Sequence, residues 1–165
     1  MLELVNLFEM IAGRAALIKQ VAANKYLSQK PIYDAVQEIN VLKQVKKTAT
    51  EYRLPEAPLL IFAQIQMDMA KHIEQYWMDY WTKQPHSFEQ ETVIPLTQIR
   101  ERMQATGKLL YQAMSQALPA LKSNSIEKKL MLFKQAFGDV KGIPSSPDYC
   151  QMMLHALVDV GQNAQ

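Results

Sequence analysis

Apolar residues recur every three or four positions over the first part of the chain. They are Leu4, Leu7, Ile11, Ala15, Ile18 and Ala22. This spacing places the side chains on one face of an α-helix, and Pro31 marks the point before which such a helix must end. The pattern therefore predicts one long amphipathic N-terminal helix of roughly thirty residues.

The same periodicity predicts five more helices. They span residues 34–52, 59–81, 96–117, 126–137 and 147–160. Asp34 and Gln37 have the spacing of a capping box at the start of one helix, and Pro147 suits the first position of the last helix. Pro119 is expected to end the helix before it, and the polar, proline-bounded stretch 84–95 is expected to be a loop.

Composition favours an all-helical fold. The chain of 165 residues is 48% hydrophobic, has only 5 glycines, and shows neither the alternation of β-strands nor an internal repeat. A chain of this length can bury a core of its own. We therefore expect an all-α fold, a six-helix bundle with one long N-terminal helix, forming a single domain over residues 1–165.

Charge and cysteine content exclude several classes of function. The 18 basic and 16 acidic residues are interspersed, which argues against a nucleic-acid or anionic membrane surface. No apolar run reaches the roughly 18 to 20 residues of a membrane span. Cys150 is the only cysteine, and we expect it in the core. The histidines His72, His86 and His155 are scattered, so we expect no metal site.

Two cations share the apolar face of the N-terminal helix. Arg14 and Lys25 are eleven residues apart, which brings them within about 20° of one direction and about 16 Å apart along the axis. Burial of an unpaired cation is costly. Either these side chains extend along the surface to reach water, or an anionic ligand lies between them.

Other charged residues have ordinary structural interpretations. Glu74 lies beside the apolar stripe that holds Trp77, where an inward carboxylate is typically part of a salt bridge. Asp34, Gln37 and Glu38 stand where a helix start favours carboxylates and capping side chains. Arg100, just inside its helix, is by itself an ordinary surface arginine.

Together these residues resemble the all-helical chorismate mutases. The signature of that family is matched by Lys25-Tyr26-Leu27-Ser28-Gln29-Lys30-Pro31-Ile32-Tyr33-Asp34-Ala35-Val36-Gln37-Glu38, with Arg14 at the family's spacing upstream. A second family pattern is similar to Gln66, Lys71, Ile73 and Glu74 on the 59–81 helix. Two positions depart from the family: Gln37 replaces an arginine, and Ala70 replaces a small polar residue that contacts substrate.

The continuation beyond three helices is similar to the longer, exported subclass. In that subclass an arginine of the same chain, matched here by Arg100, replaces one borrowed from a partner chain. The resemblance implies a homodimer, and a periplasmic or secreted location if a signal peptide has been removed. Residues 1–6 lack the basic segment and cleavage pattern of such a signal, and without a removed signal the location would be cytoplasmic.

The resemblance also implies a reaction, the rearrangement of chorismate to prephenate without any cofactor. Arg14 and Arg100 would hold the two substrate carboxylates, and Lys25 and a protonated Glu74 would donate hydrogen bonds to the ether oxygen. Asp34 and Glu38 would orient Lys25 or the ring hydroxyl, while Gln37 and Ala70 would line the substrate site. Two alternatives stay open: a binding protein that keeps the mutase fold without turnover, and an unrelated six-helix interaction module.

Overall fold

The computed structural model describes residues 1–164. Its helices are α1 (Leu2–Ala16), α2 (Ile18–Ser28), α3 (Ala35–Glu51), α4 (Glu56–Lys83), α5 (Pro85–Glu89), α6 (Leu96–Ser123), α7 (Ile126–Ala136) and α8 (Tyr149–Asn163). The all-α prediction is confirmed, and within the described range no strand is present. None of the helices in this range is long and apolar enough to cross a membrane.

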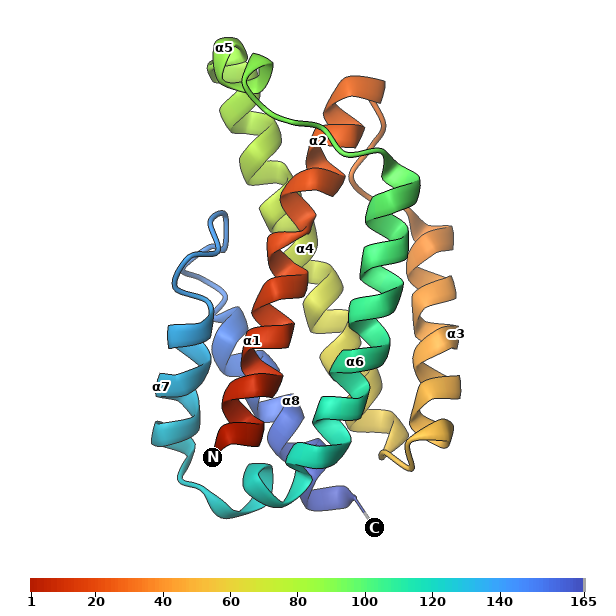
Figure 1. The fold of residues 1–165 in the computed structure, drawn as a ribbon, viewed down its shortest axis with the longest axis vertical. Helices are drawn as coiled ribbons and strands as arrows, with labels where there is room; N and C mark the ends of the chain where they lie inside the picture. The colour runs from red at the N-terminus through yellow and green to blue at the C-terminus, as the bar shows by residue number, and fades with distance from the viewer. Residues whose placement is uncertain (165) are drawn as a thin grey trace.

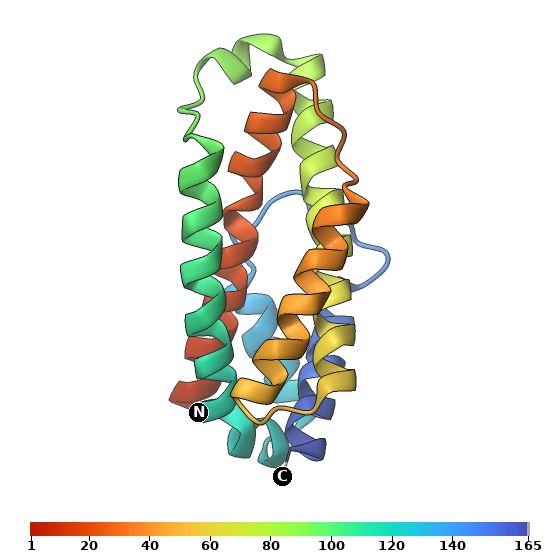
Figure 2. The same ribbon diagram turned by 90° about the vertical axis from the view of Figure 1, so that its right-hand side faces the viewer.

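The helices pack around two long central elements, α4 and α6. Helix α4 packs against α2, α3 and α8, whereas α6 packs against α1 and α8. Figures 1 and 2 show α3 at one edge of the bundle and α7 and α8 at the end that holds both termini. Helix α3 lies along the N-terminal half of α4, whereas α2 lies along its C-terminal half, where Lys19 approaches the Trp77 ring and Tyr26 packs against Trp81 (Figure 1).

The N-terminal helix follows the predicted course with one break at Leu17, which separates α1 from α2. The backbone there keeps right-handed helical angles, φ −70° and ψ −18°, but the Leu17 N–H donates to the Arg14 carbonyl at 3.1 Å. This bond reaches back three residues, so the break is one tightened turn and the axis continues (Figure 1). Helix α2 ends at Gln29, whose φ of 54° lies in the left-handed region.

Three other predictions of local structure were wrong. The expected loop 84–95 contains the short helix α5, which begins at Pro85 because proline suits a first helical position. Pro119 does not end α6, because Ala117 and Leu121 on either side of it are both buried and hold the helix in place. With α5 and the break at Leu17, residues 1–164 form eight helices rather than six.

The last helix begins later than predicted. Asp148 is its N-cap and accepts a hydrogen bond from the Gln151 N–H at 3.0 Å, so Tyr149 is the first helical residue and Pro147 lies outside. The side chain of aspartate satisfies a free amide that proline could not. Asp34 caps α3 in the same way, by accepting from the Gln37 N–H at 3.1 Å.

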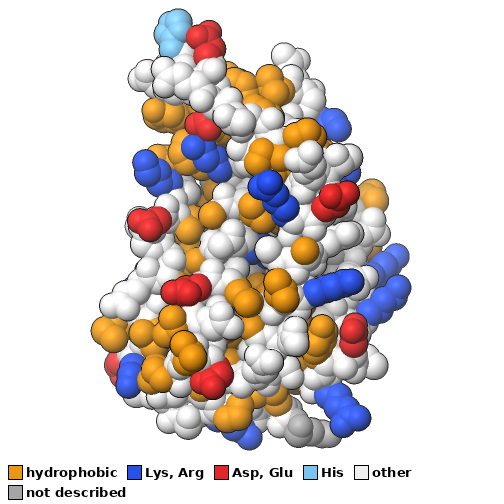
Figure 3. Space-filling model, viewed as in Figure 1, with side chains coloured by type: hydrophobic (Ala, Val, Ile, Leu, Met, Phe, Trp, Pro, Cys, Tyr) orange, Lys and Arg blue, Asp and Glu red, His pale blue; other side chains and the backbone are white. Residues whose placement is uncertain are grey.

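Part of the apolar core lies between α1 and α7. Phe8 and Phe133 pack edge to face there with ring centres 5.0 Å apart, and both are fully buried. Cys150, expected in the core, is half-buried at its margin. Acidic and basic side chains alternate over the face in Figure 3, in line with the interspersed charges of the sequence.

Candidate active site

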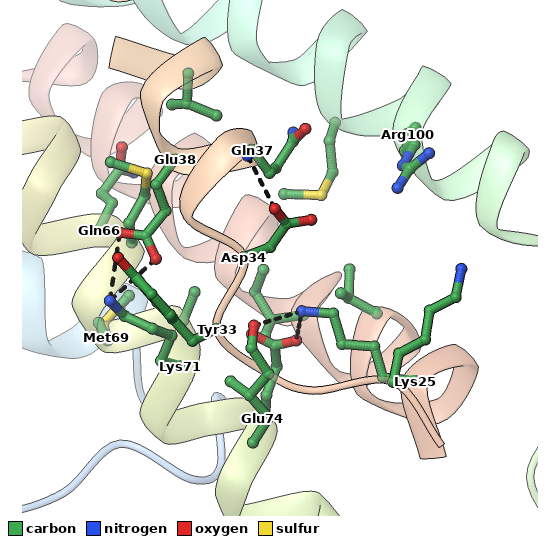
Figure 4. A pocket seen from close by; sticks show the side chains of 18 of the residues that line it. Lys25, Tyr33, Asp34, Gln37, Glu38, Gln66, Met69, Lys71, Glu74 and Arg100 are labelled. Carbon is green, nitrogen blue, oxygen red and sulfur yellow. Dashed lines mark hydrogen bonds and ion pairs between the residues drawn. The ribbon is translucent and has the colours of Figure 1, made fainter. Parts of the chain in front are cut away.

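A cavity of about 530 Å³ opens between α1, α2, α3, α4 and α6. All of the site residues predicted from the sequence line it, and Figure 4 shows most of their side chains. They are Arg14, Lys25, Asp34, Gln37, Glu38, Ala70, Glu74 and Arg100. The fold thus brings together residues from five helices, while the role of each residue stays a prediction.

Lys25, in the last turn of α2, forms the most buried ion pair of the cavity. Its Nζ lies 2.8 Å from Glu74 Oε1 on α4 and donates to the Ile32 carbonyl oxygen at 2.8 Å. Only 19% of the Lys25 side chain is exposed, so this lysine does not extend to water. In the described part of the chain Glu74, and neither Asp34 nor Glu38, is the carboxylate paired with Lys25, so of the two expected roles of Asp34 and Glu38 the one toward the ring hydroxyl stays a prediction.

Glu74 is buried at 4% exposure in the middle of α4. Its Oε1 forms the ion pair with Lys25, but the approach is not that of a hydrogen bond, and Oε1 accepts none from the described residues. Burial raises the pKa of Glu74 above its ordinary value, and the nearby Lys25 and Lys71 ammonium groups counteract part of this effect. A carboxyl group of this kind can hold a proton at higher pH than an exposed glutamate.

Arg14 and Arg100 reach the cavity without a carboxylate partner. Over residues 1–164 no Asp or Glu oxygen lies within 4.0 Å of either guanidinium. Arg14 is half-buried beside Tyr111, and burial lowers the pKa of its guanidinium from the ordinary value. Arg100 is exposed on α6 (Figure 4). An arginine remains charged under all ordinary conditions, so these are two fixed positive charges.

The position of Arg100 depends on the segment that precedes α6. The Gln20 and Asn24 side chains on α2 donate to the Thr92 and Ile94 carbonyl oxygens at 2.9 and 2.8 Å. The Ile94 N–H donates back to Gln20 Oε1 at 3.0 Å. These bonds tie the start of α6 to α2 and hold the first turns of α6 at the cavity. Nothing in the sequence periodicity indicated them.

The first turn of α3 contributes Asp34, Gln37 and Glu38. Asp34 accepts from the Gln37 N–H, whereas the return bond from the Gln37 side chain that completes a capping box is not formed within the described part of the chain. Only half of the predicted capping box is therefore present. The Gln37 side chain is exposed and lines the cavity, so it remains available to a ligand.

Glu38 is held by Lys71, on the far side of the cavity from Arg100 (Figure 4). Lys71 Nζ lies 3.1 Å from Glu38 Oε2 and 3.2 Å from Asp68 Oδ1. Burial alone would lower the pKa of Lys71, but its hydrogen bonds to Glu38 and Asp68 raise it. Ala70, adjacent on α4, lines the wall without a polar atom on its side chain.

A protein-family comparison assigns the segment that carries most of this cavity. Residues 5–75 match the family model described as chorismate mutase type II. This segment of the chain is therefore similar to the chorismate mutase type II family. The resemblance seen in the sequence is thereby confirmed, and the matched segment contains every predicted site residue except Arg100.

Solved structures extend the chorismate mutase fold over nearly the whole chain. A chorismate mutase from Burkholderia thailandensis is 19% identical with a TM-score of 0.73, covering 98% of this chain and 99% of its own. A secreted chorismate mutase from Yersinia pestis is 17% identical with a TM-score of 0.76, covering 96% of each chain. At these identities the likeness concerns the fold. A comparison with curated protein sequences gave no match.

The cavity wall also contains residues that the sequence pattern did not single out. Tyr111, Met103 and Leu96 of α6 line the cavity, and Gly107 approaches Arg14 closely. The helical spacing of apolar residues in this segment is visible in the sequence. The same spacing is found for residues that fill an ordinary core, so it does not predict a cavity wall. Only the packing of α6 against α1 and α2 distinguishes a cavity wall from a filled core.

Proposed function

We propose that this protein is a chorismate mutase that converts chorismate to prephenate in the cavity between α1, α2, α3, α4 and α6. The observation that supports this most strongly is that Arg14 and Arg100 line one cavity and have no carboxylate partner in residues 1–164. A dianionic substrate supplies the two missing partners. Charged hydrogen bonds of this kind are about twice as strong as neutral ones.

Most of the other charged side chains of the cavity are already paired within the protein. Lys25 is paired with Glu74, and Lys71 with Glu38 and Asp68. Within the described residues, the side chains of the cavity without an ion-pair partner are the two arginines, Lys30 and Asp34, so the excess charge is positive. This supports a ligand with more than one carboxylate, as chorismate has.

Catalysis in this proposal is electrostatic and conformational. The reaction has one substrate, a pericyclic step and no covalent intermediate, and we expect no cofactor. Holding the enolpyruvyl arm over the ring supplies the orientation. As the ether bond breaks, negative charge grows on its oxygen, and Lys25 and a protonated Glu74 donate hydrogen bonds to it.

The first turn of α3 completes the substrate site. We assign Asp34 or Glu38 to the ring hydroxyl and Gln37 to a carboxylate, through its side-chain amide. Ala70 leaves the hydroxyl end without the polar contact of the family pattern. Both departures weaken binding without removing the two arginines or the Lys25–Glu74 pair.

A direct assay tests the proposal. Purified protein is incubated with chorismate, and both chorismate consumption and prephenate appearance are followed. We expect turnover, and we expect Lys25→Ala to reduce it by a factor of about 10² to 10³, the effect of losing one preorganised donor. Absence of prephenate at high protein concentration contradicts the proposal.

A second candidate, a binding protein without turnover, is favoured by Gln37 and Ala70. Tight binding of a bicyclic dicarboxylate analogue of the transition state without prephenate formation would identify it.

We also propose a homodimer and export of the protein. Light scattering of the purified chain tests the dimer, and fractionation of cells that express the full gene tests export.

A further inference from the structure

Gly107 lies in the middle of α6, where a glycine is unfavourable. Helix α6 runs from Leu96 to Ser123, and Gly107 is buried within it. Glycine weakens a helix interior relative to alanine because it gives the unfolded chain more freedom. The backbone of α6 at this position is ordinary helix and has no positive φ. A conformational need therefore does not explain this glycine.

Close approach of another side chain does explain it. A Cβ atom built at position 107 would lie 2.8 Å from Arg14 Nη1 and 3.8 Å from Arg14 Cζ. Within the described chain, and apart from the backbone of α6 itself, no other atom lies within 4 Å of that Cβ. The space that a side chain would fill at position 107 is thus occupied by the Arg14 guanidinium alone.

We propose that Gly107 is a positioning residue that admits the Arg14 guanidinium into the wall of the cavity. Its consequence for turnover rests on the proposed function, whereas its effect on Arg14 does not. Arg14 extends from α1 toward α6, and the missing side chain lets the guanidinium lie against the α6 backbone beside Tyr111. Any larger residue at 107 displaces the charge from this position.

Alanine at 107 is expected to move Arg14 rather than unfold α6. Ordinary van der Waals contact to a Cβ begins at 3.4 Å, so the guanidinium must retreat by about 0.6 Å or turn aside. The colliding group is the far end of a flexible side chain, which yields more easily than backbone. A misplacement of about 1 Å in a binding group can reduce catalysis by about 10².

Three helical glycines provide the test and its controls. Gly107→Ala is the test variant. Gly13→Ala changes the residue next to Arg14, but its Cβ meets nothing within 4 Å. Gly161→Ala places a Cβ 2.9 Å from the Leu121 Cβ, a packing contact between α8 and α6.

For each variant we would measure the melting temperature, chorismate turnover, and affinity for the bicyclic dicarboxylate analogue. Gly107→Ala should keep or raise the melting temperature and lower catalytic efficiency and analogue affinity at least tenfold, which corresponds to about 1.4 kcal/mol. Gly13→Ala should change neither turnover nor affinity. Gly161→Ala should lower the melting temperature with a much smaller effect on affinity.

Coupling to Arg14 separates positioning from general packing. In an Arg14→Ala background, Gly107→Ala should cause almost no further loss of analogue affinity, whereas independent effects would add. A crystal structure of Gly107→Ala should show a displaced Arg14 guanidinium, and this readout is independent of turnover. An unmoved guanidinium, or equal losses with and without Arg14, overturns the proposal. Lack of turnover in the unaltered protein with a displaced guanidinium in the variant contradicts only the proposed function.

Discussion

Two basic side chains on inward helix faces have different surroundings. Lys129 of α7 lies at the end of the bundle that holds both termini, which we call the base, and Arg14 of α1 lies beside the cavity (Figure 1). Lys129 is 3% exposed and donates to the Leu121 carbonyl oxygen near the C-terminal end of α6. Arg14 has no carboxylate partner within residues 1–164 and lies on a cavity wall. A buried cation that donates to a protein acceptor is satisfied within the fold, whereas one without a partner in a cavity is available to a ligand.

The two regions also differ in how completely the apolar faces are covered. At the base, α1, α7 and α8 bury Phe8 and Phe133 fully. At the cavity, α3 packs on α4 but leaves Val36 at 69% and Ile39 at 52% exposure. The base therefore supplies stability and the cavity supplies a binding surface, and substitutions in the two regions should act on different measurements.

The largest expected effect is the loss of Arg14 or Lys25. Arg14→Ala and Lys25→Ala should each lower catalytic efficiency by a factor of about 10² to 10³, or about 3 to 4 kcal/mol of transition-state stabilisation. Arg14→Ala should change stability little, whereas Lys25→Ala leaves the buried Glu74 without its ion-pair partner and should also lower the melting temperature. Turnover and analogue binding would be measured together, and unchanged values for both variants would contradict the assignment of the site.

A smaller effect in the opposite direction is expected at Gln37. Gln37→Arg restores a permanent charge and should raise catalytic efficiency by roughly ten to a hundredfold, equivalent to about 1 to 3 kcal/mol. Analogue affinity should rise with it. If only the melting temperature falls, because the first turn of α3 tolerates arginine poorly, the view of Gln37 as a weakened carboxylate contact is wrong.

At the base, Lys129→Met should act on stability alone. It removes the hydrogen bond to the Leu121 carbonyl and should lower the free energy of unfolding by about 1 to 2 kcal/mol. Urea denaturation measures this, and turnover under native conditions should match that of the unaltered protein. If Lys129→Met keeps the free energy of unfolding but loses turnover, then Lys129 does not act on stability alone and the proposed difference between Lys129 and Arg14 is wrong.

The smallest expected effect is a change in pH dependence at Glu74. Burial raises the pKa of Glu74, so its protonated, hydrogen-bond-donating form is most populated at low pH and is lost as pH rises through the raised pKa. Activity should therefore decline toward alkaline pH. Glu74→Gln donates at every pH and should flatten the profile, and a variant that keeps the original profile would exclude Glu74 as its source.

Burial of Glu74 also predicts a dependence of stability on pH. A carboxyl group with a raised folded-state pKa contributes stability in its protonated form, and this contribution is lost as pH rises through the folded-state pKa. The Lys25, Lys71 and Glu38 groups that surround it modify the size of the effect but leave its direction unchanged. Thermal denaturation of Glu74→Gln against the unaltered protein over a pH series measures the difference.

The helical class, most helix boundaries and eight of the residues that line the cavity followed from the amino-acid sequence alone. Periodicity was sufficient because an amphipathic helix must bury one face whatever it packs against. Charged residues on that face, together with the resemblance at residues 25–38 and 66–74, were sufficient to single out Arg14, Lys25 and Glu74. Local capping chemistry also placed Asp34 at a helix start.

Which charges neutralise each other became visible only once the helices were packed together. The Lys25–Glu74 and Lys71–Glu38 pairs join residues 49 and 33 positions apart, and helix spacing within one segment cannot predict such contacts. The continuation of α6 through Pro119 likewise depends on burial of Leu121 against neighbouring helices. The reason for glycine at position 107 is visible only when α1 lies beside α6 and Arg14 occupies the space of the absent side chain.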